Sequence, residues 1–186
     1  IKVSDKLEGF NTDWEGFIRH LKDLGFLAAG KTIAVIGAGG ASHAICVYLA
    51  KNNPKSILIY DIDKARAVGL VEHLKDNFQG IIFNSVDSIT DLNIQESDLL
   101  VNASPNGMRE DDSLLVDSKE INSKILVYDL IYNPSQTKLL KIAASQGARV
   151  SNGLGMLLYQ GVAAFELWTG KDAPVEVMRK ALSKNS

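Results

Sequence analysis

Cysteine is almost absent from this 186-residue sequence, in which Cys46 is the single example. One cysteine cannot form a disulfide within the chain, and Cys46 stands far from any cluster of cysteine and histidine residues in the sequence. This isolation argues against a structural zinc site, and we expect no bound metal. A chain without disulfides is typical of a reducing compartment, so we expect a cytoplasmic protein.

An excess of charge of one sign is also lacking, because 20 Lys and Arg residues against 22 Asp and Glu residues leave a formal net charge of −2. Such a surface does not attract a phosphate backbone, so we expect no nucleic-acid partner. The longest apolar run, residues 35–49, is interrupted by glycines, Ser42 and His43. A membrane span needs about 20 apolar residues, so we expect no membrane contact.

An initiating methionine is missing too, since the sequence begins at Ile1. We therefore expect the chain to be a fragment or a processed product. Apolar residues make up 46% of the sequence and charged residues 23%, which is typical of a globular chain with one substantial core.

Short apolar segments alternate with helical segments through the middle of the sequence. Five segments are apolar almost throughout, as in strands covered on both faces: residues 32–36, 56–60, 81–83, 98–102 and 125–129. The pattern predicts helices over residues 42–51, 64–75 and 135–146, with weaker candidates at 88–94 and 119–121. This alternation predicts an α/β fold with a doubly wound parallel sheet.

Helices are predicted at both ends of the chain as well. Apolar residues recur at helical spacing near the N-terminal end, where Thr12 and Glu15 form the pattern of a capping box. Residues 154–169 form a long apolar-rich helix, and Pro174 opens a last one. These helices are more apolar than solvent-facing helices need to be, so we expect them to pack on something besides the sheet.

A glycine-rich turn follows the first predicted strand. Gly37 can form the tight turn, Gly39 lets the backbone approach a pyrophosphate, and the next helix directs its amide groups at that charge. Ser42 replaces the usual third glycine and still permits close packing. The pattern predicts a Rossmann-like dinucleotide site with contacts from Gly37, Ala38, Gly39, Gly40 and Ala41. The alternative is a tight turn without a ligand.

Asp61 follows the second predicted strand, at the usual distance from the glycines. Its carboxylate can accept hydrogen bonds from both hydroxyls of the adenosine ribose and would repel a 2′-phosphate, so NAD is favoured over NADP. Lys64 and Arg66 could reach a 2′-phosphate, which keeps NADP as the second choice. Alternatively, Asp61 or Asp63 caps the next helix, and Asp63 is the better cap.

Five segments match the pattern of a known family, and they occur in this order: Gly9-Phe10-Asn11-Thr12-Asp13-x-x-Gly16, Gly37-Ala38-Gly39-Gly40-Ala41, Asn102-Ala103-Ser104-Pro105-x-Gly107-Met108, Asp129-x-x-Tyr132-x-Pro134-x-x-Thr137-x-Leu139-Leu140 and Asn152-Gly153-x-x-Met156-Leu157-x-x-Gln160. Through them the chain resembles the shikimate dehydrogenase family over nearly its whole length. The resemblance implies reduction of 3-dehydroshikimate to shikimate, or the quinate counterpart, with a nicotinamide cofactor.

Two features depart from the family pattern. NADP-dependent members carry Asn-Arg and then Ser or Thr after the second strand, where this sequence has Asp61-Ile62-Asp63, which is closer to the NAD-using quinate/shikimate branch. The Ser-x-Thr-x-x-x-Lys motif, whose lysine is the family's main proton-transfer residue, does not occur in the sequence. The resemblance therefore implies that most of the N-terminal substrate domain is missing, and that the isolated chain binds cofactor without full activity.

The resemblance also divides the chain. It implies a connecting strand and helix over residues 1–30 and a dinucleotide-binding domain over residues 31–151. Residues 152–186 would then form C-terminal helices that return toward the missing substrate domain.

Four residues are candidates for the substrate side. The resemblance makes Asp13 the catalytic partner of the missing lysine, although a carboxylate in the first turn of a helix is also explained by the helix dipole. Asn11 could bond a substrate hydroxyl or simply form a turn. Gln160 lies on an apolar helix face, where an amide needs a polar partner: a substrate hydroxyl or a backbone group. Tyr132 follows the fifth strand, at the edge where such sheets bind ligands, and a packed aromatic is the alternative.

The remaining candidates lie on the cofactor side. Asn102, Ser104 and Pro105 end the fourth predicted strand, and the resemblance places them beside the cofactor. Gly153 matches a glycine that approaches the nicotinamide amide. A stand-alone nucleotide-binding regulatory module is the competing hypothesis for the whole chain. Both shikimate and quinate remain candidate substrates.

Overall fold

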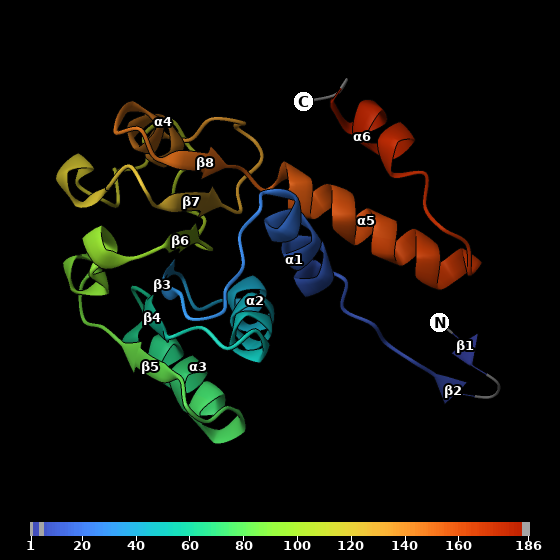
Figure 1. Ribbon diagram of the computed structural model, residues 1–186, viewed down its shortest axis with the longest axis horizontal. Helices are drawn as coiled ribbons and strands as arrows, with labels where there is room; N and C mark the ends of the chain where they lie inside the picture. The colour runs from blue at the N-terminus through green and yellow to red at the C-terminus, as the bar shows by residue number, and fades with distance from the viewer. Residues whose placement is uncertain (1, 4–5, 184–186) are drawn as a thin grey trace. The chain divides into compact units, whose positions relative to one another are not determined.

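The computed structural model describes residues 2–3 and 6–183, which form two compact units (Figure 1). Unit 1 combines the residues up to Phe26 with those from Gly155 onward, and unit 2 spans Leu27–Leu154. Among the described residues, no helix is both long enough and apolar enough to cross a membrane.

Unit 2 is built on a six-stranded sheet in which every neighbouring pair of strands is parallel. The strands are β3 (Thr32–Ile36), β4 (Ser56–Tyr60), β5 (Ile82–Ser85), β6 (Leu99–Asn102), β7 (Leu126–Asp129) and β8 (Arg149–Ser151). Their order in the sheet is β5-β4-β3-β6-β7-β8. The chain thus winds outward in both directions from the centre, which confirms the predicted Rossmann-like parallel α/β fold.

Three α-helices and three short 3₁₀ helices connect these strands. They are α2 (Gly40–Lys51), α3 (Lys64–Asn77), η1 (Ile89–Leu92), η2 (Ile94–Glu96), η3 (Ser118–Glu120) and α4 (Lys138–Ser145). Helices α2 and α3 lie side by side in Figure 1. Helix α4 begins three residues later than the sequence predicts, because the Thr137 side chain caps it by accepting a hydrogen bond from the Leu140 N–H.

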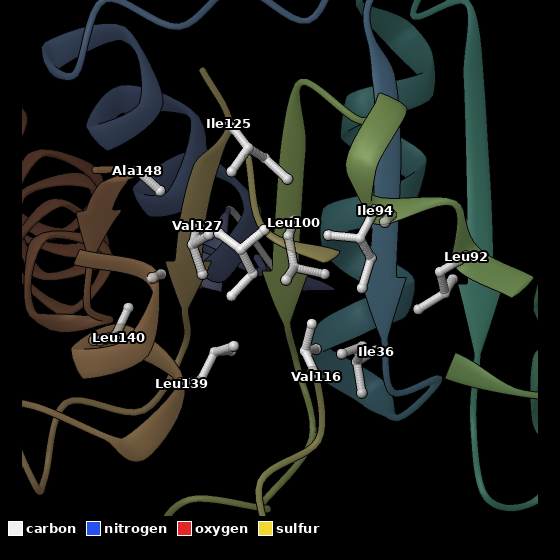
Figure 2. Packing of buried hydrophobic residues seen from close by; sticks show 13 residues of the cluster. Ile36, Leu92, Ile94, Leu100, Val116, Ile125, Val127, Leu139, Leu140 and Ala148 are labelled. Carbon is white, nitrogen blue, oxygen red and sulfur yellow. The ribbon is translucent and has the colours of Figure 1, made fainter. Parts of the chain in front are cut away.

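The central strands β3, β6 and β7 are buried on both faces of the sheet. On one face, Ile36 of β3, Leu100 of β6 and Val127 of β7 pack against α4 and the 3₁₀ segments, with Leu139 and Leu92 among the neighbours (Figure 2). The alternate residues of the same strands, which point to the opposite face, are buried as well. Burial on both faces explains why these strands are apolar almost throughout.

Among the described residues of unit 1 there are three helices and two short strands that pair in antiparallel fashion. Its elements are β1 (Lys2–Val3), β2 (Lys6–Leu7), α1 (Asp13–Asp23), α5 (Leu154–Thr169), whose first residue belongs to unit 2, and α6 (Val175–Ser183). Helices α1 and α5 approach each other closely at Gly16, where a Cβ atom would lie 2.5 Å from the Met156 carbonyl oxygen and 2.7 Å from the Gln160 nitrogen. Only a glycine permits this backbone contact.

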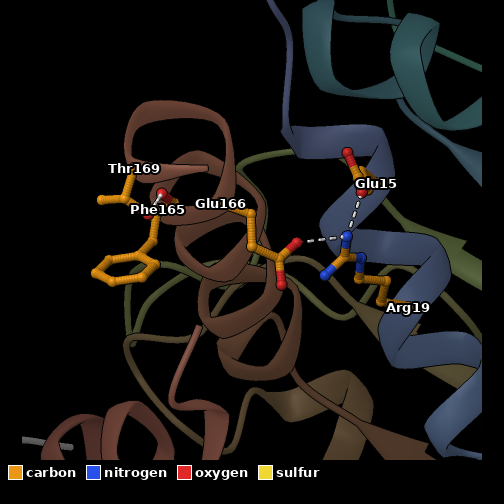
Figure 3. A network of polar contacts seen from close by, with 5 residues as sticks. All are labelled: Glu15, Arg19, Phe165, Glu166 and Thr169. Carbon is orange, nitrogen blue, oxygen red and sulfur yellow. Dashed lines mark hydrogen bonds and ion pairs between the residues drawn. The ribbon is translucent and has the colours of Figure 1, made fainter. Parts of the chain in front are cut away.

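Two clusters of polar side chains connect the helices of unit 1. Arg19 of α1 contacts Glu15 on its own helix at 2.5 Å and Glu166 of α5 at 2.9 Å (Figure 3). Tyr159 of α5 donates to Asp23 of α1 at 2.5 Å, and Arg179 of α6 donates to the same carboxylate at 3.2 Å. The hydrogen bond from Tyr159 holds the pKa of Asp23 below its ordinary value.

The predicted capping box is wrong. The Thr12 side chain forms no capping hydrogen bond, and Glu15 pairs with Arg19 instead. Asn11 replaces the box, because its side-chain oxygen accepts a hydrogen bond from the Asp13 N–H at 2.9 Å. An N–H group in the first turn of α1 therefore finds its acceptor on Asn11, one residue before the expected cap Thr12.

Candidate dinucleotide-binding site

The glycine-rich turn lies where β3 ends, at the point where the strand order reverses between β3 and β6. Gly37 has a φ of +103°, which disfavours any residue with a side chain. A Cβ atom on Gly37 would also lie 2.8 Å from the carbonyl carbon and oxygen of Ala103, just beyond β6. Two independent constraints therefore require glycine at this position.

The rest of the turn leads into α2. Gly39 is the N-cap residue, with φ −79° and ψ −172°, and a Cβ atom there would meet no atom within 4 Å. Ser42 is buried, and its hydroxyl donates to the Gly37 carbonyl oxygen at 2.6 Å. This hydrogen bond connects the start of α2 to the turn and stabilises the conformation of the turn. The first-turn amide groups of a helix need acceptors from outside it, and with the helix dipole they favour an anion.

Cys46 lies one helical turn after Ser42 and is fully buried. Its sulfur is 3.8 Å from the Ser42 hydroxyl oxygen. Burial raises the pKa of the Cys46 thiol to about 12, so this group stays protonated at neutral pH.

A pocket of about 390 Å³ opens beside the glycine-rich turn. Its walls come from the turn, the end of β4 and the segment after β6. Its lining residues are Ile36, Gly37, Gly39, Tyr60, Asp61, Ile62, Arg66, Ala103, Ser104, Pro105, Asn106 and Leu115. The pocket thus lies at the carboxyl ends of central strands, where open parallel sheets bind ligands.

Asp61 connects the end of β4 to the glycine-rich turn. Its Oδ2 accepts a hydrogen bond from the Ala38 N–H at 2.6 Å, and its Oδ1 accepts one from the Asp63 N–H at 2.8 Å. A carboxylate oxygen can accept two hydrogen bonds, so each oxygen retains one acceptor position for a ligand hydroxyl. Asp63 caps α3, with its Oδ1 3.1 Å from the Ala65 nitrogen, which confirms it as the better cap.

Arg66 contributes a positive charge to the wall of the same pocket. Its Nε atom is 3.3 Å from Asp63 Oδ2, and both side chains are more than half exposed. An exposed ion pair of this kind is weak, so the guanidinium group is available to a ligand.

Asn102, the last residue of β6, organises the segment that follows it. Its Oδ1 accepts from the Ser104 N–H at 3.1 Å and from the Ser104 hydroxyl at 2.7 Å, and its Nδ2 donates to the Asn106 carbonyl oxygen at 3.1 Å. Ser104 and Pro105 line the pocket, whereas Asn102 is buried beneath them.

Asp129, the last residue of β7, is a site residue for which sequence reasoning gave no role. It is buried and accepts hydrogen bonds from Asn102 Nδ2 at 3.0 Å, the Ile131 N–H at 3.1 Å and the Thr137 hydroxyl at 2.7 Å. Burial raises the pKa of Asp129, and these hydrogen bonds oppose the rise. The signal in the sequence was a carboxylate that ends an otherwise apolar strand.

Gly153 makes a close approach to the backbone after β7. A Cβ atom there would lie 2.0 Å from the Leu130 carbonyl oxygen, and the Gly153 N–H donates to the Ile131 carbonyl oxygen at 3.2 Å. Packing within unit 2 is thus sufficient to require glycine, and contact with a nicotinamide stays a prediction. Tyr132, in the same loop, has 48% of its surface exposed.

The other predicted substrate residues belong to unit 1. Asn11 is exposed and caps α1, and Asp13 is the first residue of that helix. Gln160 is half-buried on α5, opposite Gly16. Each has a local structural environment, and their roles toward a substrate stay predictions.

Comparisons with known proteins agree with this architecture. The strand order and the glycine-rich turn at the reversal point define a protein of the Rossmann-like α/β class. A family model described as the shikimate 5′-dehydrogenase C-terminal domain matches residues 153–182. The chain belongs to the shikimate dehydrogenase family.

Individual relatives give the extent of the match. The shikimate dehydrogenase (NADP(+)) of Methanopyrus kandleri is 42% identical over 184 residues, which cover 95% of this chain and 63% of the relative. The structure of Listeria monocytogenes shikimate 5-dehydrogenase in complex with shikimate and NAD has a TM-score of 0.86 and 36% identity, covering 92% of this chain and 62% of that one. The ligand-free 5-ketofructose reductase of Gluconobacter sp. strain CHM43 has a TM-score of 0.87 and 32% identity, covering 99% and 66%. The chain therefore spans less than two thirds of the length of these proteins.

Proposed function

We propose that this chain is the cofactor-binding part of an NAD(P)-dependent oxidoreductase that reduces 3-dehydroshikimate to shikimate, or acts on the quinate counterpart. The observation that carries the proposal is the glycine-rich turn at the strand-order reversal, with open space at Gly39 and a pocket beside it. Family membership supplies the reaction, because the matched relatives are named as shikimate dehydrogenases.

The residues of unit 2 fit a dinucleotide. The amide groups after Gly39 would bind the pyrophosphate, and the free acceptor positions of Asp61 would bind the ribose hydroxyls. Ser104, Pro105 and Gly153 would approach the nicotinamide half. The bound cofactor supplies the hydride, while the protein orients the reactants and provides protons.

The proposed substrate side comprises Asn11, Asp13, Tyr132 and Gln160. Asp13 would act as the catalytic partner of a proton donor, and the other three would bind substrate hydroxyls. The matched 5-ketofructose reductase indicates that this fold accommodates more than one ketone, so the assignment to shikimate or quinate rests on the family motifs.

We infer that the preferred cofactor is NAD, with NADP second. The Asp61 carboxylate would repel a 2′-phosphate, whereas Arg66 in the same pocket would attract it. We expect calorimetric titration to give a lower Kd for NADH than for NADPH. Asp61→Ala should weaken NADH binding about tenfold and reduce or reverse the preference. Tighter NADPH binding by the unmodified chain would refute the preference.

Catalysis would require the substrate domain that the family resemblance implies, and the matched relatives are long enough to contain one. Unit 1 supports this inference, because Trp168 on α5 has 77% of its surface exposed and Val177 on α6 has 66%. We further infer a cytoplasmic location, consistent with a single, reduced cysteine. The decisive test is NADH binding by this chain without shikimate oxidation. Turnover by the chain alone would overturn the need for the additional domain.

A stand-alone regulatory module is the less favoured function, because the matched relatives are named as enzymes. The two functions differ in the longer protein. Addition of the N-terminal segment of a relative should produce shikimate-dependent NAD reduction if the chain is part of an enzyme, and none if it is a module.

A further inference from the structure

Asp129 is a charged side chain without exposed surface at the ligand-binding edge of the sheet. The parallel register pairs it with Asn102, so the ends of β7 and β6 meet at this carboxylate. Burial of a carboxylate is unfavourable unless donors surround it, and the proposed cofactor contacts do not use Asp129. The role of Asp129 therefore depends on the three groups that donate hydrogen bonds to it.

Two of these donors belong to the same loop, one near its start and one at its end. The β7 loop, residues 130–137, is tied to Asp129 near its start through the Ile131 N–H at 3.1 Å and at its last residue through the Thr137 hydroxyl at 2.7 Å. Thr137 also accepts from the Leu140 N–H at 3.3 Å, so the loop is anchored to the start of α4. The segment between these two contacts includes Tyr132.

The third donor connects Asp129 to the β6 loop, residues 103–107. Asn102 donates to Asp129 at 3.0 Å while the rest of its amide holds Ser104 and Asn106. The two loops also touch, since a Cβ atom on Gly107 would lie 3.3 Å from Ile131 Cδ1 and 3.4 Å from Thr137 Cγ2. The β6 loop lines the pocket, so Asp129 joins the pocket wall to the β7 loop.

We propose that Asp129 is a positioning residue that holds the β7 loop against the β6 loop and thereby sets the nicotinamide half of the cofactor site. The inference rests on the proposed function. The chemistry favours a carboxylate, because all three partners donate and only a carboxylate offers two oxygens that accept without donating. An asparagine would direct an N–H₂ group at one of these donors.

Substitutions with matched controls can separate positioning from general stability. Thr137→Val removes the hydroxyl that closes the β7 loop, and Asp129→Asn replaces one of the two acceptor oxygens by a donor, whereas Thr137→Ser keeps the hydroxyl. Asp98→Asn is the control for a lost carboxylate, because Asp98 lies at the opposite end of β6 and accepts from Lys31 Nζ at 2.8 Å and the Thr32 N–H at 2.9 Å. Asn102 would still hold the β6 loop in all four variants.

NADH and ADP are the two probes, titrated by calorimetry well below the melting temperature of each variant. We expect Asp129→Asn and Thr137→Val to raise the Kd for NADH about tenfold, while the Kd for ADP, which lacks the nicotinamide half, changes less than about threefold. Thr137→Ser and Asp98→Asn should bind NADH within about twofold of the unmodified chain. Amide hydrogen exchange at Ile131 should accelerate in Asp129→Asn.

Several outcomes would overturn the inference. They are unchanged NADH binding by Asp129→Asn, equal losses for NADH and ADP, a defect in Thr137→Ser as large as that in Thr137→Val, or an equal loss in Asp98→Asn. An unmodified chain that does not bind NADH would instead refute the proposed function. Amide exchange at Ile131 would then decide separately whether Asp129 holds the β7 loop.

Discussion

Gly37 and Gly39 belong to one turn but meet different physical demands. Gly37 has a positive φ and faces the Ala103 backbone, so the fold itself requires glycine at this position. Gly39 has an extended conformation and open space around its Cβ position, so the fold does not require glycine there, and under the proposed function the requirement would come from the bound cofactor. Substitution of each glycine by alanine therefore separates folding from binding.

We expect Gly37→Ala to lower the free energy of unfolding by about 2–3 kcal/mol, because it combines backbone strain with a steric clash. Gly39→Ala should change it by less than about 0.5 kcal/mol and still weaken NADH binding at least tenfold, because a methyl group would stand where the phosphate approaches. Urea unfolding and calorimetry measure the two quantities. Equal destabilisation by both substitutions would contradict this assignment.

Asp61 illustrates how far the sequence can predict a site. The spacing from the glycines indicates a ribose acceptor, and the structure places Asp61 in the pocket. Its hydrogen bond to the Ala38 N–H joins residues 23 positions apart. That contact depends on the pairing of Ile36 with Tyr60 across β3 and β4, which local patterns do not specify.

The strands and helices show the same division between local and long-range information. Strands β3 and β4 have the predicted ends, because continuous apolar runs mark strands buried on both faces. Strand β8 was not predicted, because its three residues lie at the edge of the sheet and two of them are exposed. The weak helix candidates at 88–94 and 119–121 fall on 3₁₀ segments, which are too short for a helical pattern.

Contact between α1 and α5 makes the stability of unit 1 depend on pH. The His20 ring lies against Gly155, where a Cβ atom would be 2.0 Å from the ring, and burial lowers the pKa of His20. Asp23 raises this pKa and Arg179 lowers it, but burial is the largest effect. Between the folded and unfolded pKa values, the unfolded chain binds more protons, so acid favours unfolding.

We therefore expect the contribution of His20 to be complete above the unfolded pKa of about 6.5 and to decline as the pH falls toward the folded value. The melting temperature should drop more between pH 7.5 and 5.5 in the unmodified chain than in His20→Gln. His43→Gln, which alters an exposed histidine of α2, serves as the control. An identical drop in all three proteins would exclude His20 as the cause.

The whole chain distributes the proposed roles over its two units. Unit 2 contains the glycine-rich turn, the pocket, Asp61 and Asp129, whereas Asn11, Asp13 and Gln160 belong to unit 1. The cofactor half of the proposed site is thus contained in one folded unit.

This distribution predicts different responses to the two ligands. NADH at about 100 times its Kd should add about 2.7 kcal/mol of stability and raise the melting temperature by about 5–10 °C. Shikimate alone should leave the melting temperature unchanged. Thermal unfolding with each ligand, and with Gly39→Ala as the control that loses the NADH effect, measures this difference. Stabilisation by shikimate alone would indicate that the chain already holds a complete substrate pocket.

The labelling rate of Cys46 offers a kinetic measure of NADH binding. The only cysteine of the sequence is fully buried in α2, beneath the glycine-rich turn, and its thiol stays protonated. A thiol-reactive reagent can therefore modify it only when this part of unit 2 opens, so the labelling rate reports the frequency of opening. Bound NADH would hold the turn closed and slow the labelling in proportion to its occupancy. The chain thus carries its own chemical probe for cofactor binding, without any added label site.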